Sequence, residues 1–154
     1  MGLQVRVLAE SEIRDVIGPP DALRVVRAAF VALARGEASL PGVIGLTLPN
    51  GGEVHVKGAY LHGAPFFCIK EAAGFPGAVA HGLPTSSGMM QAFCAETGQL
   101  RGLLLDNGYL TDLRTGAAGA LCAEVLARQG VVQAGIVGTG AQARYQLEAL
   151  LSVR

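Results

Sequence analysis

Apolar residues recur at helical spacing in two long stretches of this chain. Residues 21–36 carry one at every third or fourth position, which is typical of an amphipathic helix, and Asp21 is a good N-cap. Residues 109–128 are rich in Ala and Leu and predict a second long helix, which Gly130 ends. A short helix is expected over residues 10–17, before Gly18 and two prolines.

The stretch between these two helices has the pattern of β-strands. Val54 and Val56 alternate with His55 and Lys57, which indicates a strand with one apolar face. A strong turn signal, Pro-Asn-Gly-Gly, stands just before it. Further strands are expected at residues 4–8, 43–48 and 66–70, and as a hairpin of 89–95 with 100–106. Residues 74–88 are predicted to form a long Gly/Pro-rich loop, and loops of that length are often functional.

Composition narrows the function classes. Of the 154 residues 51% are hydrophobic and 16% charged, with twelve basic and twelve acidic residues, so no basic field exists to recruit nucleic acid or an anionic membrane. The N-terminus lacks the pattern of a signal peptide, and no apolar run is long enough to span a bilayer. Cys68, Cys94 and Cys122 are expected to be buried free thiols, which favours a cytoplasmic location.

The end of the chain carries the clearest motif. An apolar run over 134–137 leads into Gly138-Thr139-Gly140-Ala141-Gln142-Ala143, and a helical pattern follows. A strand, a G-x-G-x-x-A turn and a helix open a dinucleotide-binding βαβ unit, in which the glycines admit a pyrophosphate to the helix N-terminus. The alternative is a tight turn in an unrelated α/β unit. We therefore predict an α/β fold: a substrate-binding and dimerisation domain over 1–130, and the start of a nucleotide-binding Rossmann domain over 131–154.

Two cationic residues are candidates for anion binding. Arg114 lies near the start of the predicted helix 109–128, with small residues after it, and arginine suits bidentate phosphate recognition. Taken alone, it reads more simply as a solvent-facing residue of an Ala-rich helix. Lys70 ends an apolar strand, where a lysine usually extends its head to solvent. The sharper interpretation is a lysine that binds a carboxylate. His55, His62 and His81 are scattered and lack metal-ligand spacing, so they are expected at the surface or behind a site.

Several segments together resemble the ornithine cyclodeaminase/μ-crystallin family. They are KEAAGFP from Lys70 on, GLPTSSG, the AETG turn, LTDLRTGAAGA, and VGTGAQARYQLEAL at the end of the chain. DNGYLTDLRT and GEVHVKGAY look most like the branch of ectoine-utilisation cyclodeaminases. The resemblance covers essentially the whole chain, and it is to the N-terminal portion of the family fold.

The resemblance implies hydride transfer between a nicotinamide cofactor, NAD or NADP, and the α-carbon of an amino acid or cyclic imino acid. It also implies a homodimer. Lys70 matches the lysine that binds the substrate carboxylate. The cofactor-binding residues implied in the same way are Thr85, Arg114, Thr115, Gly138, Gly140, Ala141 and Gln142.

Two departures from the family pattern stand out. Gly45 occupies the position of an arginine that clamps the substrate carboxylate, and Lys57 on the next strand is a substitute charge. The family's catalytic aspartate, and the acidic residue that holds the cofactor ribose, fall beyond Arg154. Three alternatives to a cyclodeaminase therefore stay open: a ketimine or pyrroline-carboxylate reductase, a non-catalytic binding protein like μ-crystallin, and a truncated remnant.

Overall fold

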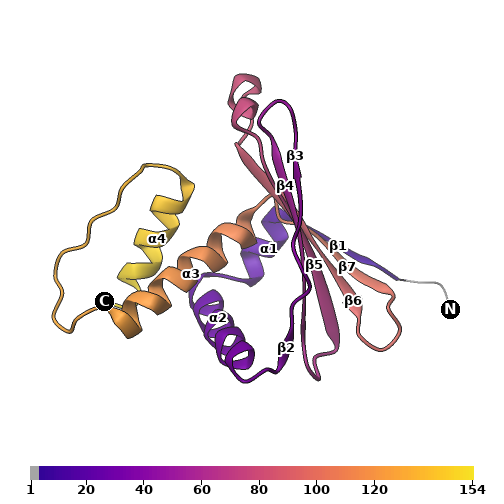
Figure 1. Cartoon of the computed structure of the whole chain (residues 1–154), viewed down its shortest axis with the longest axis horizontal. Helices are drawn as coiled ribbons and strands as arrows, with labels where there is room; N and C mark the ends of the chain where they lie inside the picture. Colours follow the sequence, from indigo (N-terminus) through magenta and orange to yellow (C-terminus); the bar gives the residue numbers. More distant parts are fainter. Residues whose placement is uncertain (1–3) are drawn as a thin grey trace. The chain divides into compact units, whose positions relative to one another are not determined.

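The computed structural model describes residues 4–154 and divides the chain into two compact units (Figure 1). One unit holds the chain up to Val16 together with Ala32–Tyr109, and the other holds Ile17–Val31 with Leu110–Arg154. A mixed sheet dominates the first unit and helices the second, so the predicted α/β class is confirmed. The domain boundary near residue 130 stays a prediction.

The first unit is built on a seven-stranded sheet. Its strand order is β1-β7-β6-β5-β4-β2, and β3 also pairs with β4. All pairs are antiparallel except β1 with β7. The strands are β1 (Arg6–Ala9), β2 (Ala38–Ser39), β3 (Ile44–Thr47), β4 (Glu53–Leu61), β5 (Phe66–Gly74), β6 (Ser86–Cys94) and β7 (Leu100–Leu105).

The connection predicted over 74–88 is present but shorter, over residues 75–85. β5 runs on to Gly74 and β6 already starts at Ser86, which leaves a short connection with a 3-10 helix, η1 (Pro76–His81). Small residues pair here, as Ala73 does with Ser87, so no alternation of large apolar side chains marks these strand ends. A Cβ at Gly88 would lie 2.7 Å from the Glu71 carbonyl oxygen, so the pairing depends on this glycine.

The alternation predicted for β4 is confirmed. Val54 and Val56 are half-buried, whereas His55 and Lys57 are exposed. The prediction of buried cysteines is wrong, although all three thiols are free. Cys68 and Cys122 are exposed and Cys94 is intermediate, because the apolar runs that carry them lie on surfaces that no other part of residues 4–154 covers.

Helix α1 (Glu10–Val16) also belongs to the first unit and lies against β1 and β7. Its Ile13 is 2% exposed and anchors it. The Arg14 guanidinium stacks on Tyr109, with 3.9 Å between its carbon and the ring centroid. A stacked cation of this kind adds about 0.5–2 kcal/mol. The short helix predicted over 10–17 is thus confirmed.

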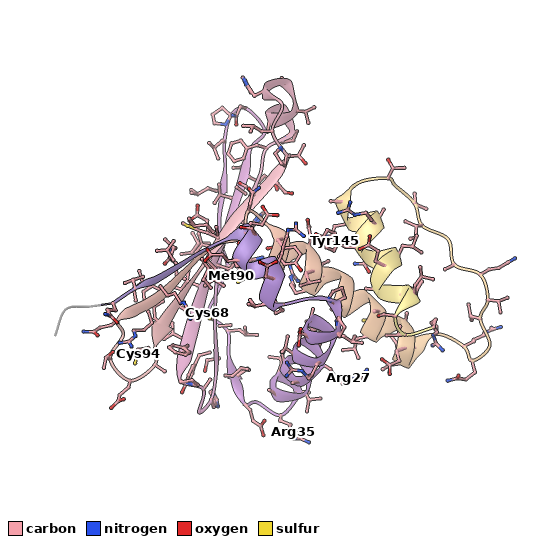
Figure 2. The ribbon with its side chains drawn as sticks, turned by 180° about the vertical axis from the view of Figure 1, so that it is seen from behind. Arg27, Arg35, Cys68, Met90, Cys94 and Tyr145 are labelled. Atoms are coloured by element: carbon pink, nitrogen blue, oxygen red, sulfur yellow. The ribbon has the colours of Figure 1, made fainter. Side chains whose placement is uncertain are left out.

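The second unit consists of α2 (Pro19–Ala34, up to Val31), α3 (Tyr109–Leu126, from Leu110) and α4 (Ala141–Leu151). Arg27 of α2 forms an ion pair with Glu124 of α3. Helices α3 and α4 run parallel: Asp112 bonds Gln142 near their starts, and Arg154 bonds the Ala123 carbonyl near their ends. Tyr145, labelled in Figure 2, is buried where α4 packs on α3.

The predicted strand over 133–137 is not formed. Residues 131–139 have no strand pairing and are exposed, with Val132 at 93% of its full accessible surface. A parallel strand is held by hydrogen bonds to neighbouring strands. None of the strands within residues 4–154 pairs with this segment, so its apolar pattern alone does not fix it.

Close packing of α3 on α4 makes Gly116 sensitive to substitution. A Cβ there would lie 2.7 Å from the Tyr145 carbonyl oxygen, which is backbone, whereas one at Gly119 would meet only the end of the Gln146 side chain. Overpacking costs about 1–3 kcal/mol and exceeds the roughly 1 kcal/mol that alanine gains over glycine in a helix. Gly116→Ala should therefore lower the free energy of unfolding by up to about 2 kcal/mol in denaturant titrations. Gly119→Ala is the matched control and should change it by less than about 0.5 kcal/mol. Equal effects of the two variants would contradict this packing.

Candidate functional site

Two lysines lie directly opposite each other on the sheet of the first unit. Lys57 of β4 is in register with Lys70 of β5, and Lys70 is in turn opposite Met90 of β6, which Figure 2 labels. Side chains in register share one face of a sheet. Like charges placed opposite each other destabilise a strand pair, and an anion between them removes that repulsion. Register thus brings together the two lysines that the sequence predicted as carboxylate ligands, and that role stays a prediction.

Cys68 lies on the same face, two residues before Lys70, and does not offset the two positive charges. Burial among neighbouring atoms raises the pKa of the Cys68 thiol, although the residue as a whole is exposed. The thiol is therefore uncharged at neutral pH.

His55 is a further residue on this face, and the sequence did not predict it as part of the site. Gly45 is opposite His55, and a Cβ at this glycine would lie 3.8 Å from His55 Cδ2 and within 4 Å of no other atom beyond its chain neighbours. The glycine where the family pattern has an arginine thus leaves open space beside an exposed imidazole. Only strand register reveals this, because the two residues are ten positions apart in the sequence.

Thr85 lines a cleft of about 550 Å³ in the first unit. Its carbonyl accepts a hydrogen bond from the Phe75 N–H at 2.7 Å, which ties the end of the β5–β6 connection to its beginning. Other polar residues of the cleft are Asn50, His81, Ser86, Ser87 and Asn107. Side chains of this kind suit a ligand rich in hydroxyl or amide groups. The connection, shorter than predicted, still carries a cleft.

The glycine turn before α4 has the features that a phosphate needs. Gly138 has φ of 110°, which favours glycine, and nothing beyond the chain neighbours lies within 4 Å of where a Cβ at Gly138 or Gly140 would be. Gly140 is the N-cap of α4, and no side chain caps the helix there. Open N–H groups at a helix N-terminus bind anions.

Parallel packing places the start of α3 beside this turn. Gln142 Nε2 donates to Asp112 Oδ1 at 2.5 Å, and Gln146 Nε2 donates to the Thr115 carbonyl at 3.1 Å. Arg114, between these two contacts along α3, is exposed. Asp112 is a residue of this place that the sequence did not single out. Its contact with Gln142 spans thirty positions and leaves no local signal in the sequence.

One buried atom at this place has no partner. Gln142 Oε1 is inaccessible to solvent and accepts no hydrogen bond within residues 4–154. A buried acceptor without a donor costs about 1–3 kcal/mol. Within residues 4–154, the side-chain oxygen of Gln142 in the first turn of α4 therefore lacks a hydrogen-bond donor.

Two features are absent from the described residues: a metal-binding cluster and a membrane-spanning helix. Among residues 4–154 there is no group of three or more His, Cys, Asp or Glu side chains that could hold a metal ion. In the same residues no helix has both the length and the apolar character needed to cross a membrane.

Comparison with known proteins agrees with the motifs. Residues 4–154 match the ornithine cyclodeaminase/mu-crystallin family. A cyclodeaminase of Sinorhizobium fredii, itself uncharacterised, is 44% identical over 153 residues, which cover 97% of this chain and 46% of that protein. The chain spans about half the length of the curated relatives it matches.

Solved structures show the same fold. An archaeal alanine dehydrogenase dimer with bound NAD superimposes with a TM-score of 0.90 at 33% identity, over 97% of this chain and 46% of that one. The Δ1-pyrroline-2-carboxylate reductase of Thermococcus litoralis, in complex with NADH and L-proline, gives 0.92 at 29% identity with the same coverage. The fold of this chain is therefore that of the N-terminal half of these proteins.

Proposed function

Because this chain belongs to the ornithine cyclodeaminase/mu-crystallin family, we propose that it forms the N-terminal part of an enzyme that uses NAD or NADP. The reaction is hydride transfer at the α-carbon of an amino acid or a cyclic imino acid. One observation carries the proposal: the open glycine turn of α4 lies beside the start of α3, which bears Arg114 and Thr115.

The residues of the second unit fit a dinucleotide. Gly138 and Gly140 leave open the approach to the uncapped N-terminus of α4, where Ala141 and Gln142 offer the first N–H groups of the helix. Since α3 starts beside α4, Arg114 is available to pair with the same pyrophosphate. Thr85, which lines a cleft of the first unit, is assigned to the cofactor only by the resemblance to the family. The bound nicotinamide supplies the hydride acceptor or donor.

The lysine pair of the first unit binds the substrate carboxylate in this proposal. In the oxidative direction the α-C–H bond breaks and its two electrons leave with the hydride. The amine loses a proton, and the product is an imine. Lys57 and Lys70 fix the carboxylate and so hold the α-carbon in place, which contributes to rate through orientation. Reduction of an imino acid is the same transfer in reverse.

Related proteins support both directions and a homodimer. The alanine dehydrogenase structure is a dimer with NAD, and the reductase structure holds NADH and L-proline. Exposed apolar side chains on β3, Ile44 and Leu46 among them, suit a second copy of the chain. The cyclodeaminase direction, a lyase reaction, and the cytoplasmic location stay predictions.

A second candidate is a non-catalytic binding protein, as in the μ-crystallin members of the family. Gly45 favours it, because glycine cannot supply the charge of the arginine that the family pattern has there. The two functions differ in whether amino acid and cofactor, once bound, react.

Neutralising Lys70 tests the proposed enzyme. Lys70→Gln removes half of the carboxylate-binding pair, and a hydrogen bond to a charged group contributes about 1.5–3 kcal/mol. We expect kcat/KM for an amino or imino acid to fall roughly tenfold to a hundredfold, in the protein as its gene encodes it. Arg101→Gln is the matched control, an exposed cation on β7 of the same sheet, and should leave kcat/KM unchanged. Binding of amino acid and NAD without any turnover in the unsubstituted protein would favour the binding-protein alternative.

A further inference from the structure

We infer that the sheet face of Lys57 and Lys70 takes an amino or imino acid with a second carboxylate, which His55 binds in the space that Gly45 leaves open. The inference rests on the proposed function, because it assigns the first carboxylate of the same substrate to the lysine pair. It adds the substrate class, the dicarboxylates, and a residue that decides it.

Strand register gives the arrangement of the three basic side chains. Lys57 and Lys70 are directly opposite, so their Cβ atoms are about 5 Å apart. His55 is on the same face, two residues before Lys57, and is diagonal to Lys70 across the strand pair at about 7–8 Å. Three basic groups thus surround one patch of two strands.

The space for a longer substrate lies beside His55. On the β3 side His55 is opposite Gly45, and a Cβ built at this glycine would lie 3.8 Å from His55 Cδ2 with no other atom within 4 Å beyond its chain neighbours. A larger residue at position 45 would fill that space. The second carboxylate of a short dicarboxylate, held by its first at the lysine pair, reaches this space.

The charge on this face also points to two anionic groups. His55 and Lys57 have no hydrogen-bond or ion-pair partner within residues 4–154. Along β4 the next acidic residue on the face is Glu53, which is opposite Gly74 at the end of the strand pair. A dicarboxylate therefore provides one acceptor for the lysine pair and a second for His55.

Aspartate and asparagine distinguish this inference from a simple carboxylate site, because they have the same shape and differ in one charge. Their affinities are measured by NMR titration of the protein as its gene encodes it, with the ring signals of His55 as a local probe. We expect aspartate to bind at least about tenfold more tightly than asparagine, with a shift of the His55 signals for aspartate. Equal affinities would overturn the inference.

Three variants sharpen the test. His55→Gln should remove most of the preference for aspartate, and Gly45→Leu should weaken aspartate and asparagine by about tenfold while alanine, which lacks the longer side chain, changes little. Arg101→Gln, on β7, is the charge-matched control and should preserve the preference. An unchanged preference in His55→Gln would overturn the role of His55.

Lys70→Gln separates this inference from the proposed function on which it rests. If it weakens all three amino acids but aspartate and asparagine bind the unsubstituted protein equally, the carboxylate site stands and the dicarboxylate inference fails. If Lys70→Gln changes none of the affinities, the carboxylate site itself is wrong and the proposed function fails with it.

Discussion

A polypeptide made of residues 1–154 alone should show no cyclodeaminase, dehydrogenase or imine-reductase turnover. It covers 46% of the length of the NAD-bound relatives, and its segment 131–139 has no strand pairing. The resemblance places the catalytic aspartate beyond Arg154. A general acid or base contributes about 10²–10⁴-fold to a rate, and orientation of the cofactor contributes more.

The measurement is the absorbance of the reduced nicotinamide with NAD(H) and NADP(H), over a panel of amino and cyclic imino acids. The positive control is the same residues joined to the remaining half of the family fold. Turnover by the separate polypeptide within a factor of ten of that control would contradict the division of the site between the two halves.

Loss of the Arg114 guanidinium should weaken cofactor binding by roughly tenfold to a hundredfold. Arg–phosphate hydrogen bonds contribute about 1.5–3 kcal/mol each, and exposure of Arg114 places the effect toward the lower end. Calorimetric titration of nicotinamide cofactor into Arg114→Ala, in the protein as its gene encodes it, measures the loss. The free energy of unfolding should change little, since the side chain is exposed.

Arg128→Ala is the control for this prediction, because Arg128 is exposed just beyond the opposite end of α3. It should leave the affinity for the cofactor unchanged. An Arg114→Ala variant that binds as tightly as the unsubstituted protein would remove Arg114 from the site. Equal losses in both variants would indicate a general electrostatic effect and no specific contact.

Local signals predicted most elements of the fold. The alternation around Val54 and Val56 requires a strand with one covered face, and β4 has it. The apolar spacing of residues 21–36 predicts a helix, and α2 begins two residues earlier because prolines are tolerated in a first helical turn. The strand ends at 72–74 and 86–88 were not predicted, because their small residues pair as strands without any apolar alternation.

Local signals failed where a residue depends on distant neighbours. The cysteines sit in apolar runs, but exposure is decided by what covers a surface, and two of the three are exposed. Residues 134–137 have the apolar pattern of a strand, but a parallel strand forms only against partner strands.

The sequence by itself determined the family, most of the helices and strands, and the identities of the candidate residues, because motifs and side-chain periodicity are local properties of the chain. Only the tertiary structure decided which of these residues meet. Strand register places Lys57 opposite Lys70 and His55 beside Gly45, and parallel packing of α3 on α4 places Asp112 on Gln142. Such contacts join positions ten to thirty residues apart. Hydrogen-bond pairing between strands and close packing around Gly116 hold these contacts in place. Neither can be predicted from a short segment of the sequence.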